Sequence, residues 1–271
     1  MKIATYNVRN LFLHHEGEAK PRAELRALTR MIALVDADVL ILQEVGSSVS
    51  LERLNDHLPA PYPYAGLLEG NSDRSIHLGV LGRHAHTLTG HTEQRLPDGE
   101  GGVLQGYAGE AQAQTGELTA LRMSRDILRV DLTDYPLSLF GVHLKSRTER
   151  RWQHVSALTV RAAEVRLLLE TAQSWRRAEP GRIQLLLGDF NDTPSSDALA
   201  PLRDDYVDVF ADLLRGTRKR PSTYWPKRRM RIDQIYVSRD ARARVHEPVI
   251  HAGSMAQQAS DHYPVSVCLD A

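Results

Sequence analysis

Short apolar segments with strand character alternate with segments of helical spacing along most of this chain. The strand-like runs occupy residues 2–8, 38–45, 76–83, 126–132, 137–144, 185–189, 231–238 and 263–269. A chain of 271 residues with this alternation is compatible with one large α/β domain or with two small ones. Because no repeat and no Ser/Gly- or Pro-rich linker interrupts the pattern, we expect one domain over residues 1–271.

Two longer segments have apolar residues at helical spacing. The first begins near Pro21, which suits the first turn of a helix. Between the two long segments, a shorter helix is expected to follow Ser47 or Ser48. A long helix is expected after Thr148, ending at Pro180-Gly181. Its apolar stripe comprises Val155, Leu158, Ala162, Val165, Leu169 and Ala172. Residues 84–125 have weak periodicity, and we interpret them as a long excursion with one strand pair.

The run LLLGDFNDTP, residues 185–194, combines a buried strand with a polar tip. Three leucines lead into a glycine, and Asp189, Asn191 and Asp192 follow within four positions. Asp and Asn are typical of turns, because their side chains bond to nearby backbone N–H groups. Strand tips are also where catalytic and binding groups lie. This stretch alone leaves both interpretations open, with Asp192 expected to cap the turn before Thr193.

Other strands also end with, or contain, an ionisable or amide group. The eight groups, on six strands, are Asn7, Glu44, His143, Asp189, Asn191, Asp233, Asp261 and His262. Most have an ordinary explanation when taken singly, as a cap, a turn residue or a buried histidine. Asp233 is different, because a carboxylate inside an apolar strand costs several kcal/mol unless it is paired. Their occurrence together in one chain indicates a site at the strand ends.

The chemistry of the eight groups is consistent with phosphate-ester hydrolysis. Carboxylate and amide oxygens suit a hard cation such as Mg²⁺ or Mn²⁺. A histidine beside an aspartate can act as a general base or as a charged imidazolium. The sequence has no Walker-type phosphate loop and no Cys/His spacing of a structural zinc site.

Six motifs resemble those of the endonuclease/exonuclease/phosphatase superfamily, in the same order. They are TYNVRN, LILQEV, GVHLKS, GDFNDTP, RIDQIYVS and SDHYPV, and they extend from residue 5 to residue 265. The superfamily includes pancreatic-type DNase, apurinic-site endonucleases, neutral sphingomyelinases and inositol polyphosphate 5-phosphatases. The resemblance implies a four-layer α/β sandwich, in which two mixed β-sheets lie face to face with helices outside. It also implies metal-dependent hydrolysis of phosphate esters.

The resemblance further implies a metal site. Glu44 matches the main ligand, Asn7 the amide that supports it, and Asp261 an additional carboxylate at the metal. Arg74 lies where related proteins often have a basic residue near the phosphate.

Catalytic roles follow from the same matches. His262 resembles the histidine that faces the scissile phosphate, oriented by Asp233. Asp189 resembles the group that positions or deprotonates the attacking water, and Asn191 the amide that contacts the phosphate in the transition state. His143 matches a second histidine found in the DNase-like and sphingomyelinase-like branches, which the apurinic-site endonucleases lack.

Two basic runs adjoin these strands and favour a nucleic acid as substrate. Residues 215–231 hold eight Lys/Arg and no acid, and residues 145–151 hold four more basic residues. Charge runs are often only solvated faces, but next to catalytic strands they fit a phosphate-binding rim. The candidate substrate-binding residues are Arg74, Lys145, Arg218, Lys219, Arg220, Arg228 and Arg229. We therefore expect a DNA endonuclease, with a sphingomyelinase-like lipid or small-molecule phosphodiesterase or phosphatase, and a catalytically dead binding scaffold, as alternatives.

Composition limits which partners and which cellular compartment we expect for this protein. Lys+Arg and Asp+Glu both total 34, so the net charge itself indicates no anionic partner. The single cysteine, Cys268, excludes an intrachain disulfide. The sequence has no apolar run of membrane-spanning length and no apolar signal core at its start. We expect a monomer without stable membrane association, cytoplasmic as the sequence stands, with secretion as the alternative if a leader was removed.

Overall fold

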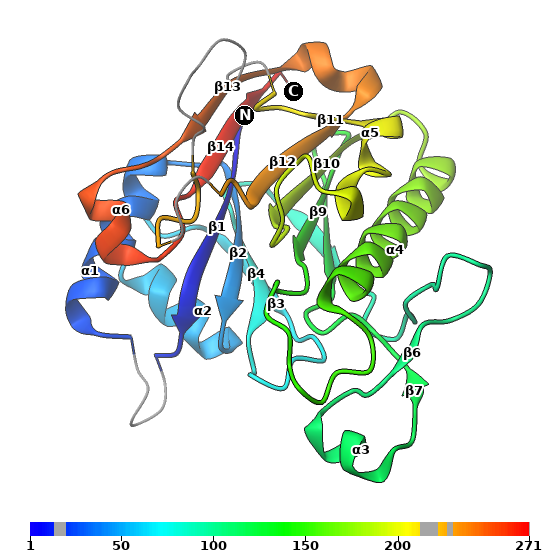
Figure 1. Cartoon of the computed structure of the whole chain (residues 1–271). Coiled ribbons are helices and arrows are strands. Elements are labelled where there is room, and N and C mark those ends of the chain that lie inside the picture. Colours follow the sequence, from blue (N-terminus) through cyan, green and yellow to red (C-terminus); the bar gives the residue numbers. More distant parts are fainter. Residues whose placement is uncertain (14–19, 212–221, 227–229, 271) are drawn as a thin grey trace.

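Two six-stranded mixed β-sheets form the centre of the molecule (Figure 1). The computed structural model describes residues 1–13, 20–211, 222–226 and 230–270. The first sheet has the order β13 (Val245–Ile250), β14 (Val265–Leu269), β1 (Lys2–Leu11), β2 (Val39–Val45), β4 (His77–Gly82) and β3 (Tyr64–Leu68). The second has the order β11 (Tyr206–Asp208), β12 (Asp233–Ser238), β10 (Ile183–Asp189), β9 (Leu137–His143), β8 (Ile127–Leu132) and β5 (His86–Thr89). Each sheet has a central parallel pair, β1–β2 or β9–β10, with antiparallel strands on both sides.

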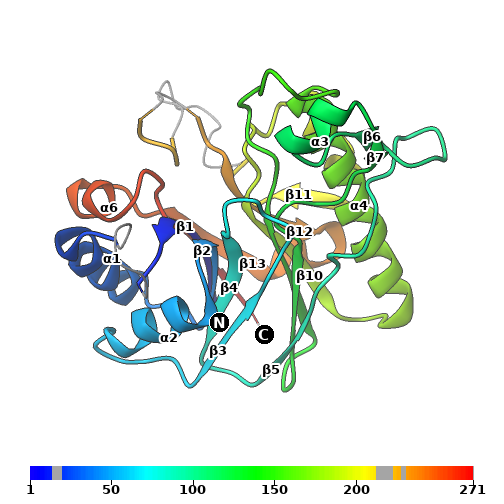
Figure 2. The same ribbon diagram turned by 90° about the horizontal axis from the view of Figure 1, so that it is seen from below.

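Helices cover the outer face of each sheet, so that the molecule has four layers (Figure 2). The helices on the first sheet are α1 (Arg22–Val35), α2 (Ser48–Asp56) and α6 (Ser254–Ala259). Those on the second sheet are α4 (Ala157–Ala178) and the short α5 (Leu202–Asp205), with the 3₁₀ turn η1 (Asp197–Leu199) between them; a second turn, η3 (Arg239–Arg244), follows β12. The expected four-layer sandwich is confirmed. Within the described residues, no helix is long and apolar enough to cross a membrane.

The excursion over residues 84–125 contributes to both a sheet and a small projection. Its first strand, β5, pairs with β8 at the edge of the second sheet. The expected strand pair consists of β6 (Gln105–Gly106) and β7 (Thr119–Ala120), which flank the short helix α3 (Glu110–Thr115). This projection lies beyond the first turns of α4 (Figure 1).

Some boundaries differ from those expected. The long helix begins at Ala157 rather than soon after Thr148, because Ser156 caps it by accepting a hydrogen bond from the Thr159 N–H at 3.1 Å. Leu158, assigned to the buried stripe, is 49% exposed and faces solvent. The edge strands β3 and β13 were not expected, because the first is short and contains a glycine and the second contains Pro248 and Glu247.

Period-two alternation along the inner strands decides where the polar groups point. Leu185 and Leu187 of β10 enter the apolar layer between the sheets, and Asp189 is the next residue of that series. The same series in β9 leads to His143, and in β12 it begins at Asp233. In the strand pairing, Asp189 lies opposite both His143 and Asp233. Three polar side chains therefore meet at one end of the inter-sheet layer.

Gly188 precedes Asp189 and cannot carry a side chain. Its φ is +141°, and a Cβ would lie 2.0 Å from the Val142 carbonyl oxygen of the neighbouring strand. We expect Gly188→Ala to lower the free energy of unfolding by about 3 kcal/mol, through the strained backbone and the displaced strand. Urea unfolding measures this loss. Gly109→Ala is the control, because a Cβ there meets no atom within 4 Å; we expect it to cost less than about 1 kcal/mol, and an equal loss in both variants would contradict the explanation.

Candidate active site

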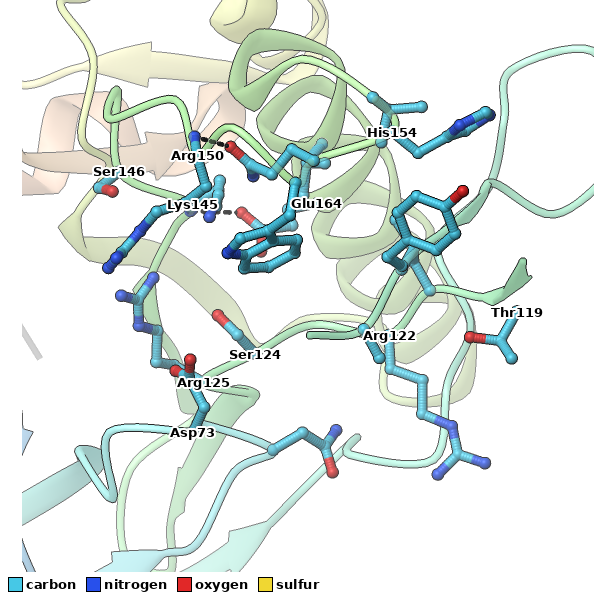
Figure 3. A pocket seen from close by; sticks show the side chains of 18 of the residues that line it. Asp73, Thr119, Arg122, Ser124, Arg125, Lys145, Ser146, Arg150, His154 and Glu164 are labelled. Atoms are coloured by element: carbon cyan, nitrogen blue, oxygen red, sulfur yellow. Dashed lines mark hydrogen bonds between the residues drawn. The ribbon is translucent and has the colours of Figure 1, made fainter. Parts of the chain in front are cut away.

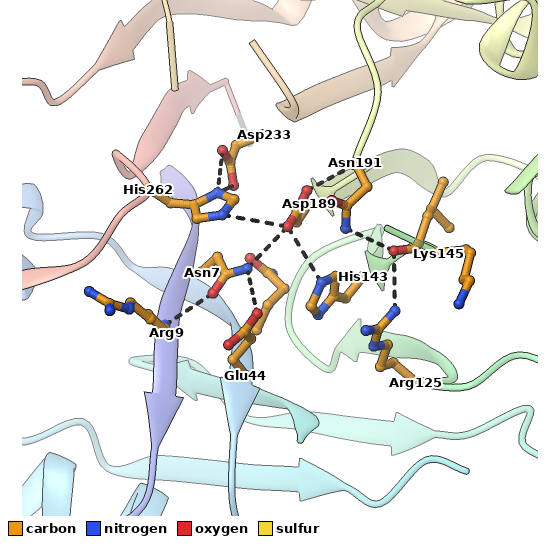
Figure 4. Close-up of polar contacts among 12 residues, drawn as sticks. Asn7, Arg9, Glu44, Arg125, His143, Lys145, Asp189, Asn191, Asp233 and His262 are labelled. Atoms are coloured by element: carbon orange, nitrogen blue, oxygen red, sulfur yellow. Dashed lines mark hydrogen bonds and ion pairs between the residues drawn. The ribbon is translucent and has the colours of Figure 1, made fainter. Parts of the chain in front are cut away.

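Asp189 is the centre of a buried polar cluster at the strand ends (Figure 4). Its Oδ2 accepts a hydrogen bond from Asn7 Nδ2 at 3.1 Å and lies 3.5 Å from His143 Nε2 and 3.8 Å from His262 Nε2. Its Oδ1 accepts from the Asn191 N–H at 2.8 Å. Burial raises the pKa of this carboxyl to about 7, against the lowering effect of His262. A carboxylate of this basicity can take a proton near neutral pH.

His262 forms a buried ion pair with Asp233. Its Nδ1 lies 2.9 and 3.0 Å from the two Asp233 oxygens, and Nε2 points toward Asp189. Burial alone lowers the pKa of the imidazole, but Asp233 and Asp189 together raise it to about 10. His262 is therefore positively charged at neutral pH, in an orientation that Asp233 holds.

His143 has the opposite electrostatic setting. Its ring is 3% exposed, and its Nδ1 has no hydrogen-bond partner among the described residues. Burial, followed by the charges of Arg125 and His262, lowers its pKa well below the usual value. The site therefore combines a neutral and a charged histidine on either side of one carboxylate, an arrangement suited to acid/base chemistry.

Glu44 reaches the site through a β-bulge. Alternation along β2 would direct it to the helix-covered face, but the pairing of β2 with β4 shifts after Gln43, and Glu44 has a left-handed φ of +64°. Its Oε1 lies 3.5 Å from Asn7 Nδ2, and its Oε2 accepts from the Asn10 N–H at 3.0 Å. The adjacent strand β1 is irregular at the same level, where Arg9 and Asn10 also have positive φ. These two strained strand ends place Glu44 and Asn7 side by side.

Asp261 and Asn191 lie at the margins of the cluster. The Asp261 carboxylate accepts a hydrogen bond from Ser260 Oγ at 3.4 Å, and its charge contributes to the raised pKa of His262. Asn191 has a φ of +52°, and its Nδ2 donates to the Leu144 carbonyl at 2.9 Å. All eight predicted residues thus lie at or beside one end of the inter-sheet layer.

Glu44 and Asp261 carry carboxylate oxygens of the kind that bind Mg²⁺ or Mn²⁺, whereas Asn7 turns its Nδ2 toward Glu44 and accepts the Arg9 N–H at its Oδ1. Asp189, Asp233 and His262 also offer ligand atoms within 4.8 Å of one another. His262 Nδ1 is bonded to Asp233 and the ring is charged, however, whereas a metal ligand must be a neutral imidazole. Glu44 is partly exposed, so an ion can reach it from solvent.

The predicted substrate-binding residues have different outcomes. Arg74 lies beside the cluster: its Nη2 is 3.8 Å from Glu44 Oε2 and donates to Asn10 Oδ1 at 2.8 Å. Lys145 lines an adjacent pocket. The remaining five lie outside the described residues: Arg218, Lys219, Arg220, Arg228 and Arg229.

Two charged residues, Arg231 and Asp192, form buried ion pairs in the fold. Arg231, the last basic residue of the 215–231 run, is buried and forms a bidentate ion pair with Asp208, so it cannot belong to an exposed rim. Asp192 caps Thr193 as expected and in addition accepts two hydrogen bonds from the buried Arg161 of α4, at 3.0 and 2.6 Å. That ion pair fixes the loop after β10.

The structure adds three residues to which the sequence assigned no role in the site. Lys20 is buried, and its Nζ donates to the Val8 and Arg9 carbonyls of the irregular end of β1. The Tyr224 ring lies 5.0 Å from the His262 ring. Arg125 is 8% exposed, and its Nη1 lies 3.4 Å from the Leu144 carbonyl that Asn191 also contacts. Their roles depend on contacts between distant segments, for which the sequence carries no signal.

Glu164, on α4 beside this site, supplies a pH prediction. Burial raises its pKa from 4.5 to about 7, although Lys145 donates its N–H to Oε2 at 2.6 Å. Below pH 4.5 the folded and unfolded chains both hold the proton. As pH rises from 4.5 toward 7 the unfolded chain releases the proton first. The free energy of unfolding therefore falls by about 3 kcal/mol. We expect the stability of Glu164→Gln relative to wild type to be about 2 kcal/mol higher at pH 8 than at pH 5.

Urea unfolding of both proteins at the two pH values measures this difference. The exposed Glu170 of the same helix provides the control, because Glu170→Gln should show no such pH dependence. An equal response of the two variants would contradict the assignment to Glu164.

Comparisons with known proteins agree with this fold. The model of the Endonuclease/Exonuclease/phosphatase family matches residues 4–262, and the chain belongs to this family. Members of the family are hydrolases that act on phosphoester bonds. No curated protein sequence matches the chain.

Several solved structures share the fold at low sequence identity. Truncated TDP2 from Caenorhabditis elegans superposes with a TM-score of 0.63 at 14% identity, covering 100% of this chain and 97% of that one. The 3′-5′ exonuclease NExo from Neisseria meningitidis gives 0.63 at 14%, and an AP endonuclease from Archaeoglobus fulgidus gives 0.62 at 13%, each with complete coverage of both chains. These similarities establish the architecture.

Proposed function

We propose that this protein is a divalent-metal-dependent phosphodiesterase, acting as a DNA endonuclease through a single catalytic domain of residues 1–271. The observation that carries the proposal is the contact of Asp189 with Asn7, His143 and His262 at the strand ends of a phosphoesterase fold. A catalytically dead scaffold would have no need of a buried carboxylate held beside a charged and a neutral histidine.

Each group of the cluster has its own role in the in-line attack of water on the phosphate. Asp189 orients the water and accepts its proton, which its raised pKa permits near neutral pH. His262, held charged by Asp233, faces the phosphate and stabilises negative charge that develops on its oxygens. His143 and the Asn191 amide add hydrogen bonds to the same phosphate. Glu44, Asn7 and Asp261 would hold Mg²⁺ or Mn²⁺, which neutralises charge on the phosphate or leaving oxygen when bound.

Nucleic acid is the substrate class that the surrounding charges favour. Arg74 and Lys145 lie beside the cluster, and the other five predicted binding residues fall in the basic run just before the strand that bears Asp233. Basic groups around a catalytic cleft fit the phosphates that flank a scissile bond. The solved structures with this fold include proteins described as a 3′-5′ exonuclease and an AP endonuclease.

A substrate panel tests the proposal. Purified protein is incubated with Mg²⁺ or Mn²⁺ and supercoiled plasmid, single-stranded DNA, RNA or sphingomyelin vesicles. We expect plasmid nicking, followed by linearisation. Hydrolysis of sphingomyelin without nicking would replace the nuclease assignment with that of a lipid phosphodiesterase, and no activity on any substrate would favour the dead scaffold.

A further inference from the structure

A pocket of about 480 Å³ adjoins the catalytic cluster, and its lining includes Arg74 and Lys145, the two predicted substrate-binding residues that the structure describes. Its walls come from the 84–125 excursion, the segment after β9 and the first turns of α4 (Figure 3). Arg125, Lys145 and Arg150 project into it from one side, with Glu164 behind Lys145 (Figure 3). The pocket is therefore built where the excursion folds back against the strand that carries His143.

The basic side of the pocket is not neutralised by ion pairs. None of Arg125, Lys145 and Arg150 forms a salt bridge with a carboxylate in the described part of the chain. Arg125 is buried, and its Nε has no hydrogen-bond partner there. Two carboxyl groups line the pocket, Asp73 and Glu164, and burial raises the pKa of Glu164 to about 7. The remaining positive charge suits an anion with several acceptor oxygens.

Aromatic rings also line the pocket. Tyr107, Trp152 and His154 line the pocket, and the rings of Tyr107 and His154 meet edge to face at 5.5 Å. The same three residues also line a second hollow, together with the charged residues Arg151 and Glu110. Cationic groups combined with aromatic faces are the means by which proteins hold a single strand of nucleic acid.

Two contacts join the pocket to the catalytic residues. Arg125 Nη1 and Asn191 Nδ2 lie 3.4 and 2.9 Å from the same Leu144 carbonyl oxygen. Arg74 lines the pocket and also lies 3.8 Å from Glu44. An anion held by Arg125 is therefore a near neighbour of a phosphate at Asn191.

We propose that this pocket binds the nucleotide next to the scissile phosphodiester, with its second phosphate on Arg125, Lys145 and Arg150 and its base against Trp152. This subsite rests on the function proposed above. It makes the active site selective for nucleotide diesters over other phosphate esters. The projection of residues 105–120 then serves to complete a substrate subsite.

Binding of thymidine 3′,5′-bisphosphate tests the subsite without requiring catalysis. Titration calorimetry in EDTA compares wild type with Lys145→Met, Arg150→Ala and Trp152→Ala, which avoid the buried Arg125. We expect wild type to bind the bisphosphate at least about tenfold more tightly than thymidine 5′-monophosphate, and each variant to raise the Kd for the bisphosphate by about tenfold. Arg177→Ala, exposed at the other end of α4, is the charge-matched control and should leave the Kd unchanged.

A separate assay keeps the two proposals apart. Hydrolysis of bis-p-nitrophenyl phosphate with Mn²⁺ reports on the catalytic cluster, because this diester has no second phosphate and no base. Equal Kd values for the bisphosphate in wild type and all three pocket variants, or no binding to wild type, would overturn the subsite. Failure to hydrolyse the small diester, with the binding pattern intact, would instead count against the proposed function.

Discussion

His262→Ala is expected to lower kcat for plasmid cleavage by about 10²–10⁴-fold, the range for loss of a charge-stabilising or acid/base group. The charged imidazole, held by Asp233, is the group that faces the phosphate in the proposed mechanism, and no other described side chain occupies its position. Asp233→Asn should show a smaller loss of the same kind, because the ring keeps a hydrogen-bond acceptor but loses the negative charge that keeps it protonated. Initial rates of nicking at saturating metal measure both effects.

The exposed His246 provides the control for this experiment. It lies on the edge strand β13, 3.6 Å from Asp270 and away from the cluster, so His246→Ala should retain full activity. Circular dichroism and thermal unfolding of each variant separate loss of catalysis from loss of fold. Near-full activity of a folded His262→Ala protein would rule out the mechanism proposed here.

Removal of the divalent metal is expected to abolish hydrolysis. EDTA should reduce plasmid cleavage by at least about 10²-fold, and added Mg²⁺ or Mn²⁺ should restore it, because the ion supplies several kcal/mol of transition-state stabilisation. Glu44→Gln should lower activity at low metal concentration by a similar factor and raise the metal concentration needed for half-maximal rate. The neutral amide keeps the size of the side chain but is a weaker ligand.

Glu52→Gln is the matched control, because Glu52 is an exposed residue of the neighbouring helix α2. It should change neither the rate nor the metal dependence. Undiminished hydrolysis in EDTA would overturn the metal assignment, whereas an unchanged metal dependence in Glu44→Gln would move the ion to other ligands, with Asp189, Asp233 and His262 as the next cluster to test.

The sequence by itself determined the inner strands of the sandwich and the residue types at their ends. Side chains alternate between the two faces of the sheet along β9, β10 and β12, and this period of two carries His143, Asp189 and Asp233 onto the inter-sheet face. These strands are central and covered on both faces, so their local pattern and their tertiary environment agree. Edge strands such as β3 and β13 lack that agreement, and the sequence did not predict them.

Only the tertiary structure decided how the remaining site residues are oriented. Glu44 points to the site because a bulge reverses the alternation of β2, and Lys20 supports the irregular end of β1 from a different segment. Arg231 and Asp192 form ion pairs with Asp208 and Arg161, partners that lie 23 and 31 residues away in the sequence. The alternation of side chains is a property of neighbouring residues, which a sequence displays directly. Bulges, ion pairs and the pocket beside Arg125 depend on which distant segments pack together, and that is decided by the folded chain as a whole.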